Sequence, residues 1–172
     1  MSKIKIGWSE VSIVPEGRRM ELPGQLYERI SDTVETPIAV TAMAMETAED
    51  CFVYVSCDLI LTSYSLLEEV RAALPSDCGF PKEKLMIGAI HTHTSVSYPR
   101  RMDSFSNSRT DLEQFKPAHV EYVSLVRDNS PDIFRGEEAR AFVVERIVRA
   151  ACEAWTKSFY KAGQILSLQD FL

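Results

Sequence analysis

The sequence predicts an α/β fold with a mixed β-sheet, and three patterns carry that prediction. A strand pattern over 52–57, a helical pattern over 63–74 and a strand pattern from Leu85 follow one another. This order is typical of a βαβ unit, whose two strands lie parallel with a right-handed crossover. An alternating apolar segment over 37–46 precedes the unit, and a long amphipathic helix over 137–157 follows it.

Length and composition fit one globular domain over residues 1–172. Lys and Arg number 19 against 25 Asp and Glu, and no basic patch stands out, which argues against nucleic acid as a partner. No apolar run is long enough for a transmembrane segment. Because the start lacks the apolar core of a signal peptide, we expect a cytoplasmic protein.

The amino-terminal elements follow from local patterns. Residues 3–14 predict a first strand, interrupted near Gly7 and ended by Pro15. Residues 16–24 predict a loop, because Pro and Gly punctuate them. The loop carries Arg18 and Arg19, which either grip an anionic group or are simply solvated, and we favour solvation.

The next two strands predict a hairpin. The segment 37–46 has small or apolar side chains on both faces, so both faces are expected to be covered. Glu49 and Asp50 form the turn, and Asp58 follows the strand 52–57 at its carboxyl end.

Two helices complete the expected frame. Leu66, Leu67 and Val70 begin an apolar stripe in the helix 63–74, which Pro75 ends. In the helix 137–157 the charged side chains, Arg140 and Arg149 among them, lie mostly away from the apolar face.

Residues 95–132 form the least regular segment, which contains His119. A loop of that length is either functional, as a lid or binding loop, or a mobile insertion, and the sequence favours neither.

The four cysteines, Cys51, Cys57, Cys78 and Cys152, form no Cys-x-x-Cys pair. We expect thiols rather than a disulfide framework or a metal site.

The strand from Leu85 ends on His91-Thr92-His93, which holds two of the three histidines. Alternation along a continued strand would place both imidazoles on one face and Thr92 on the other. Imidazoles at a carboxyl strand end are suited to binding a metal or to acid–base chemistry. The alternative is that they are structural.

Three stretches together resemble the amino-terminal domain of the neutral/alkaline (non-lysosomal) ceramidases and their bacterial relatives. They are Gly7-Trp8-Ser9-Glu10-Val11-Ser12-Ile13-Val14-Pro15, Val55-Ser56-Cys57-Asp58-Leu59 and Ile90-His91-Thr92-His93-Thr94. The first looks like the family's opening strand, which ends Asp-Ile-Thr-Pro. The second is similar to its strand ending Asp-Leu, and the third to its Thr-His-Thr-His-Ser. Order and spacing fit over roughly residues 4–160.

The resemblance implies a zinc-dependent hydrolase that cleaves the amide bond of ceramide. It implies that His91 ligates zinc, that His93 holds the substrate or its oxyanion beside the metal, and that Gly24 lines the pocket. A catalytic zinc takes about three protein ligands and leaves one position open.

Departures from the family pattern leave two functions open. Ser12 and Val14 replace an acidic residue and a threonine, and Ser95-Val96-Ser97 stands where the family has Gly-Pro-Gly. No His follows His119, although the family's other zinc ligands, a His, a Glu and a Tyr, lie further on. We therefore expect the amino-terminal part of a larger, truncated ceramidase-like domain with an incomplete zinc site.

The expected ligand of such a protein is an amide or a lipid-like molecule, and unpaired strand edges predict a homo-oligomer. The alternative is a non-catalytic α/β remnant or binding module. A third reading is an unrelated α/β protein with an incidental His-Thr-His.

Overall fold

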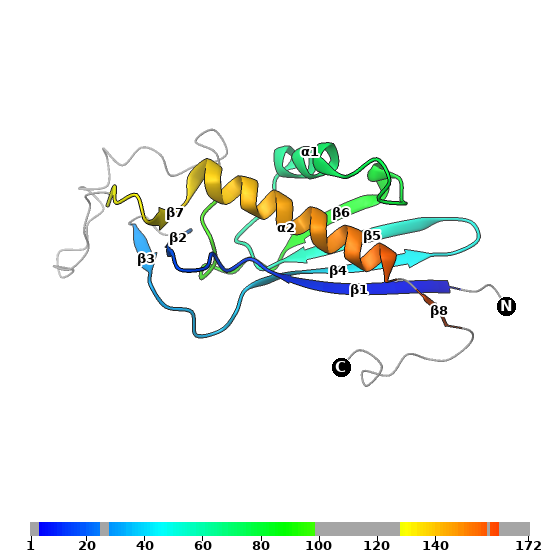
Figure 1. The fold of residues 1–172 in the computed structure, drawn as a ribbon, viewed down its shortest axis with the longest axis horizontal. Coiled ribbons are helices and arrows are strands. Elements are labelled where there is room, and N and C mark those ends of the chain that lie inside the picture. Colours follow the sequence, from blue (N-terminus) through cyan, green and yellow to red (C-terminus); the bar gives the residue numbers. More distant parts are fainter. Residues whose placement is uncertain (1–3, 25–27, 99–127, 158, 162–172) are drawn as a thin grey trace.

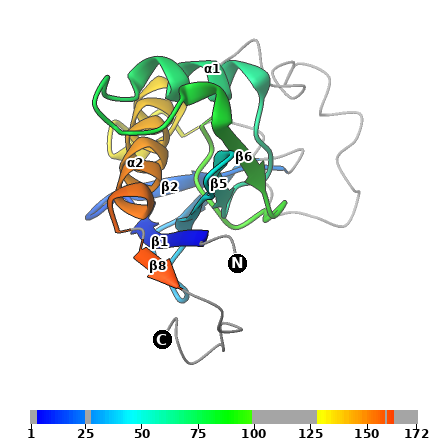
Figure 2. The ribbon, with the colours of Figure 1, turned by 90° about the vertical axis from the view of Figure 1, so that its right-hand side faces the viewer.

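The structure is a computed structural model that describes residues 4–24, 28–98, 128–157 and 159–161. Within these residues, five strands form one mixed sheet, and two α-helices lie on the same side of it (Figures 1 and 2). This arrangement confirms the predicted α/β class. In spatial order the strands are β6 (Leu85–Ala89), β5 (Cys51–Cys57), β4 (Ala39–Glu46), β1 (Ile4–Ser12) and β8 (Phe159–Lys161).

The predicted βαβ unit is present. Strands β5 and β6 pair in parallel, with Val53 opposite Leu85, and α1 (Tyr64–Ala73) connects them. Ser63 begins the helix as its N-cap, since its hydroxyl accepts a hydrogen bond from the Leu66 amide at 3.1 Å. A short 3₁₀ turn, η1 (Lys82–Lys84), then leads into β6.

The predicted hairpin of β4 and β5 is confirmed, and β1 pairs with β4 on its other side. The expected interruption of β1 near Gly7 is wrong. Gly7 lies opposite Ala44 in an unbroken antiparallel ladder that runs to Ser12. Two small residues meeting there leave room for the helix layer without bending the strand.

A second, smaller sheet corrects the expectation of a loop over 16–24. Its order is β3 (Arg29–Ser31), β2 (Arg19–Leu22) and β7 (Ile133–Phe134). Arg19 lies opposite Ile133 and Met20 opposite Phe134, so these short strands exist because of partners more than a hundred residues away. Met20 is buried, which ties the small sheet to the core.

The core lies between the large sheet and α2 (Gly136–Thr156), which contacts β1, β4 and β5. Ala139, Val143, Ile147 and Ala150 on the buried helix face are fully buried. Small side chains bring the backbones close enough for the Ser9 hydroxyl to donate a 2.6 Å hydrogen bond to the Ala150 carbonyl.

The opposite face of the large sheet carries an apolar row across four strands. The row runs through Trp8, Met43, Tyr54 and Met86, which are successive cross-strand partners. Trp8 is 45% exposed and Met86 48% exposed, and neither helix covers this side (Figure 2). The Tyr54 ring lies over Gly88, where an added Cβ would lie 2.4 Å from the hydroxyl oxygen. The segment 37–46 has small or apolar side chains on both faces, and we expected both faces to be covered. In the structure, the two helices cover only one of them.

Among the described residues, no helix is long and apolar enough to cross a membrane. Of the irregular segment predicted over 95–132, only 95–98 and 128–132 fall within the described residues, and His119 lies outside them. The single-domain assignment and the predicted oligomer both stay predictions.

Candidate functional site

The two neighbouring histidines lie in a loop rather than in a strand. Strand β6 ends at Ala89, and the chain then turns over the β5–α1 connection. The Ile90 amide donates to the Cys57 carbonyl at 3.1 Å, and the His91 amide donates to the Leu59 carbonyl at 3.1 Å. His91 has φ 66°, a left-handed conformation that a continued strand does not contain. The expected alternation through His91 and His93 is therefore wrong.

The turn nevertheless brings the imidazoles together. The ring centroids of His91 and His93 lie 5.2 Å apart, with the planes nearly perpendicular at 80°. His91 Nδ1 lies 2.7 Å from the Ile60 carbonyl oxygen. Because a carbonyl only accepts, this contact places the proton of a neutral His91 on Nδ1 and leaves the lone pair on Nε2. Histidines that ligate metals commonly donate their other ring N–H to a backbone carbonyl in this way, which orients the ring.

Gly24 and Arg29 both contact His93. Gly24 has φ +88°, and a Cβ built on it would lie 2.3 Å from His93 Nδ1 and 2.5 Å from the Ile60 Cδ1 atom. Any side chain at position 24 would therefore displace the imidazole. The Arg29 guanidinium donates a hydrogen bond to the His93 carbonyl. The structure thus brings together all three residues that the sequence singled out, although their roles stay predictions.

A cleft of about 440 Å³ adjoins the histidine loop through Thr92 and Thr94. Among the described residues, its charged lining residues are Asp58 and Glu35. Asp58 Oδ2 accepts a 2.8 Å hydrogen bond from the Ala39 amide, which fixes the carboxylate at the end of β5. The remaining walls are hydroxyl-bearing or apolar: Met20, Leu22, Ser31, Thr33, Val34, Thr36, Pro37, Ile38 and Ile90. Neither imidazole lines the cleft itself.

The donor set does not by itself fit a catalytic zinc. Such a site takes about three protein ligands. In the parts of the chain that the structure describes, no group of three His, Cys, Asp or Glu side chains is placed to hold a metal. His91 offers one well-oriented nitrogen and His93 a second nearby, so the two histidines are at most part of a metal site.

The site rests on a buried polar layer that the sequence pattern did not reveal. Tyr98 is buried, and its hydroxyl donates to the Leu61 carbonyl, the residue after Ile60. The guanidinium carbon of Arg140 lies 5.8 Å from the centre of the Tyr98 ring. Arg140 is 1% exposed and donates to Glu69 at 2.8 Å and to Ser65 at 2.9 Å. The expectation that Arg140 lies away from the apolar helix face is wrong, because a carboxylate and a hydroxyl on α1 receive it.

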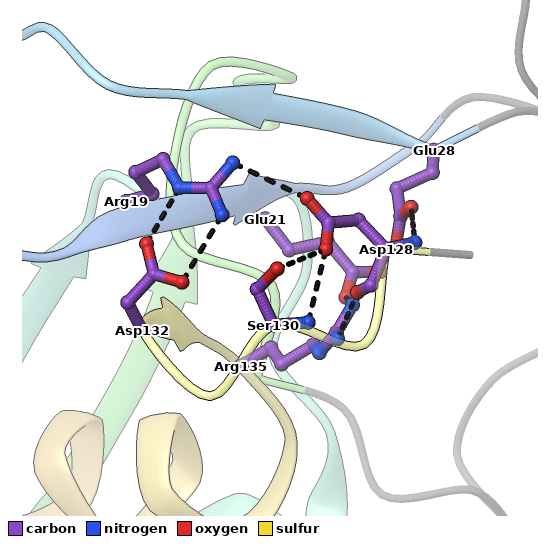
Figure 3. A network of polar contacts seen from close by, with 7 residues as sticks. All are labelled: Arg19, Glu21, Glu28, Asp128, Ser130, Asp132 and Arg135. Atoms are coloured by element: carbon purple, nitrogen blue, oxygen red, sulfur yellow. Dashed lines mark hydrogen bonds and ion pairs between the residues drawn. The ribbon is translucent and has the colours of Figure 1, made fainter.

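The arginine pair of the predicted loop is also differently placed. Arg19 lies in β2 and donates to both carboxylate oxygens of Asp132, at 2.6 and 3.1 Å, and to Asp128 at 3.2 Å (Figure 3). Arg18 donates to Glu138 at 2.9 Å. Intramolecular carboxylates thus occupy both guanidinium groups, and neither the solvated reading nor an anion site describes them.

A polar network continues from Arg19 around the small sheet (Figure 3). Arg135 bonds Glu28 at 2.8 Å and Glu21 at 3.3 Å, while the Asp128 amide donates to Glu28 at 2.7 Å. The Arg19 guanidinium lowers the pKa of Asp132, and hydrogen bonds from Ser130 are the main cause of the lowered pKa of Asp128. The network connects residues 128–135 to β2, the strand that precedes Gly24.

No protein-family model and no curated protein matches this chain. Its fold, however, is similar to that of the neutral ceramidase from Pseudomonas aeruginosa, with a TM-score of 0.66 at 19% identity. A structure described as ceramidase complexed with C2 gives a TM-score of 0.65 at the same identity. Each match covers 92% of this chain and 22% of the other, so the chain spans about a fifth of these ceramidases. The expected partial ceramidase-like fold is thereby confirmed.

Proposed function

We propose that this chain forms the amino-terminal portion of a ceramidase-like zinc-dependent amide hydrolase, in which the His91–His93 loop supplies part of the catalytic site. The observation that carries this proposal is the convergence of Gly24, His91 and His93 at the end of β6, in a fold shared with neutral ceramidase. In this proposal the remaining metal ligands come from polypeptide outside the described residues.

The contacts of the site residues support the roles that we propose for them. His91 presents Nε2 because Ile60 holds Nδ1, so it is the residue best prepared to ligate a metal. His93 is positioned by Arg29 and Gly24 and can donate a hydrogen bond to a substrate carbonyl oxygen, where negative charge develops during amide hydrolysis. Gly24 leaves space for the His93 imidazole and adopts a left-handed backbone conformation. Any other residue type would place a Cβ in that space.

The residues that line the cleft support a particular class of substrate. The charged lining groups among the described residues are carboxylates, which disfavour anionic ligands. Threonine and serine hydroxyls suit a hydroxylated polar end, and Met20, Leu22 and Ile38 suit an apolar portion. These features support an uncharged amide with hydroxyl groups, either lipid-like or small.

Two observations bear on completeness. The apolar row through Trp8, Tyr54 and Met86 leaves one sheet face exposed, which supports a place for this chain within a larger fold. The second candidate function is a non-catalytic α/β domain or binding module, which we retain because no group of three metal-binding side chains lies among the described residues. That candidate predicts a folded protein without tight metal binding and without hydrolysis.

Metal content separates the two candidates. The full chain, incubated with zinc and desalted, is compared with His91→Ala, with His119→Ala and with Cys51→Ser as a control far from the loop. The first function predicts that the wild type and the control retain zinc, at less than one equivalent if ligands from further polypeptide are required, and that His91→Ala loses it. Loss in His119→Ala as well would identify a third ligand. Hydrolysis of a short-chain fluorescent ceramide, against a simple short-chain amide, then reports activity. A folded wild type with neither zinc nor hydrolysis would support the binding module.

A further inference from the structure

The face of the large sheet that points away from both helices is apolar across four strands. Beside the row through Trp8, Met43, Tyr54 and Met86, a second cross-strand row on the same face runs through Ile6, Met45 and Phe52. Among the side chains that β1, β4, β5 and β6 present on this face, Glu10 near one end is the charged one. A sheet with one solvated face usually has polar side chains on that face, whereas these strands are apolar on both faces, as in a sheet that is covered on both sides.

The order of residues in the first row makes this face complementary to itself. Aromatic and methionine side chains alternate along it, from Trp8 on β1 to Met86 on β6. A two-fold axis that runs parallel to the strands, between β4 and β5, reverses this order. Trp8 of one copy then faces Met86 of the other copy, and Met43 faces Tyr54. Each aromatic ring thereby meets a thioether, which is a favourable contact.

The same axis brings a protruding side chain to a hollow. Trp8 is 45% exposed at the β1 end of the row. At the β6 end, Met86, Phe52 and Met45 line a cleft of about 370 Å³, together with residues of the β4–β5 hairpin and of η1. The indole of each copy would thus lie against the cleft of the other.

The charge distribution and the size of the face also suit a second copy. Glu10 belongs to a cross-strand row that ends at Gly88, so the axis places this carboxylate over a glycine and away from its own counterpart. Strands lie about 4.8 Å apart and rise roughly 3.3 Å per residue, so a four-strand face of this kind measures about 20 Å by 20 Å. Covering it on two copies approaches the roughly 1,200 Å² in total at which specific, stable interfaces begin.

We propose that this face is a docking surface for a second copy of the chain, and that the two copies form a symmetric dimer whose large sheets pack face to face. Stacked sheets lie about 10 Å apart, a distance that the interdigitating side chains of two apolar faces fill. This contact differs from the pairing of strand edges that we expected from the sequence. The inference does not depend on the proposed hydrolase function.

The first test measures the mass and the methionine reactivity of the full chain. Light scattering during size exclusion should give the mass of two chains at high protein concentration, with a fall toward one chain on dilution. Dilute hydrogen peroxide converts accessible methionines to sulfoxides, which peptide mass analysis quantifies. Met86 should react several-fold more slowly in the dimer than after dilution. Met20, which is buried in each copy, should react at a rate independent of concentration.

The second test places charges at the two positions that meet. Trp8→Glu and Met86→Lys should each weaken self-association by about tenfold or more, because each charge loses water on docking without gaining a partner. An equimolar mixture of these two variants should associate again, since the carboxylate then meets the ammonium group at one end of the row and Trp8 meets Met86 at the other. A mixture of Trp8→Glu with Trp8→Lys should not associate. Tyr64→Glu, at an exposed position on α1 away from this face, is the matched control and should behave as the wild type.

Four results would overturn the proposal. The first is the mass of one chain at every concentration with Met86 reactive, which would mean that the face stays open. The second is the same mass with Met86 protected, which would mean that another part of the same chain covers it. The third is a dimer that survives both charge substitutions, and the fourth is association of Trp8→Glu with Trp8→Lys. If a charged variant fails to fold, the concentration dependence of Met86 oxidation in the wild type still decides whether a second copy covers this face.

Discussion

His91 Nδ1 lies 2.7 Å from the carbonyl oxygen of Ile60, a residue 31 positions earlier in the chain. The contact joins the loop after β6 to the loop after β5, the two parallel strands of the βαβ unit. Their carboxyl ends meet at one edge of the sheet, where α/β folds place their sites. Where the two loops meet, His91 adopts a left-handed backbone conformation.

This geometry predicts different outcomes for two substitutions of His91. Asparagine tolerates the left-handed region, so His91→Asn should unfold within about 1 kcal/mol of the wild type. His91→Ala should lose about 1–2 kcal/mol, because alanine favours the left-handed region less than histidine or asparagine and because the hydrogen bond from the imidazole to the Ile60 carbonyl is lost. Both variants lack the Nε2 donor, so both should lose any bound zinc. Urea unfolding beside metal analysis measures the two effects separately. Equal stability of both variants would show that the backbone conformation is not strained.

The contact between Gly24 and His93 predicts a steric effect beyond backbone strain. Gly24→Ala adds a Cβ at 2.3 Å from the His93 imidazole, at φ +88°. We expect a loss of roughly 2–4 kcal/mol, which combines the left-handed penalty with overpacking. The matched control is Gly17→Ala, where φ is +66° and nothing lies within 4 Å of the added atom. The control should lose only about 1–2 kcal/mol.

Denaturant unfolding of both glycine variants gives this comparison, and the NMR shifts of the His93 ring show whether the imidazole moves. A His93 signal unchanged in Gly24→Ala would mean that the loop adapts without loss of the site geometry.

The sequence predicted those elements that local pattern determines. Alternation in 37–46 and 52–57, and the helical stripes that follow, correctly predicted β4, β5, α1 and α2. The small sheet was missed because β2 forms only through its partners: Arg19 lies opposite Ile133, and Met20 opposite Ser31. A Gly- and Pro-rich segment of this length looks like a loop until the distant strand is known.

The site was predictable in composition but not in geometry. Gly24, His91 and His93 were identified by resemblance, and they do lie together. Strand alternation was the wrong basis for expecting the two imidazoles on one side. The left-handed backbone of His91 turns the chain away from β6, and the imidazoles meet in the loop that follows. The position of Arg140 was predicted wrongly, because the spacing of residues along α2 does not show that Glu69 on α1 pairs with the buried guanidinium.

The carboxylates of the polar network predict acid sensitivity. Asp132 and Asp128 both have pKa values below the ordinary range in the folded protein. Their contribution to stability is complete above the unfolded pKa of about 3.9 and is lost as pH falls through the lower folded value. Urea midpoints should therefore fall between about pH 5 and pH 3. The decrease should be smaller in Arg19→Met, which lacks the main cause of the Asp132 shift.

Two further variants sharpen this titration. Ser130→Ala should also flatten the acid dependence, because Ser130 is the main cause of the Asp128 shift. Lys82→Met removes one positive charge from the exposed 3₁₀ turn and should keep the wild-type dependence on pH. An acid dependence in Arg19→Met as steep as that of the wild type would count against the network as its origin.

The buried guanidinium of Arg140 predicts the largest effect of a charge removal on α2. Arg140→Met should lower the free energy of unfolding by about 2–4 kcal/mol, because Glu69 loses its cation and Ser65 its donor in a largely buried setting. Arg149→Met on the same helix is the matched control. Its side chain is 54% exposed and pairs with Glu153 four residues on, so the loss should be below about 0.5 kcal/mol.

The same two arginine variants test whether the buried layer positions the histidines. Arg140 lies against Tyr98, whose hydroxyl donates to Leu61, next to the carbonyl that anchors His91. We therefore expect the Nδ1–H signal of His91 in ¹⁵N-resolved NMR to broaden or shift in Arg140→Met and to stay in place in Arg149→Met. Tyr98→Phe should shift the signal while it keeps most of the stability, since it removes one hydrogen bond and retains the packed ring. A His91 signal that is insensitive to all three changes would mean that the loop after β5 holds its shape without this layer.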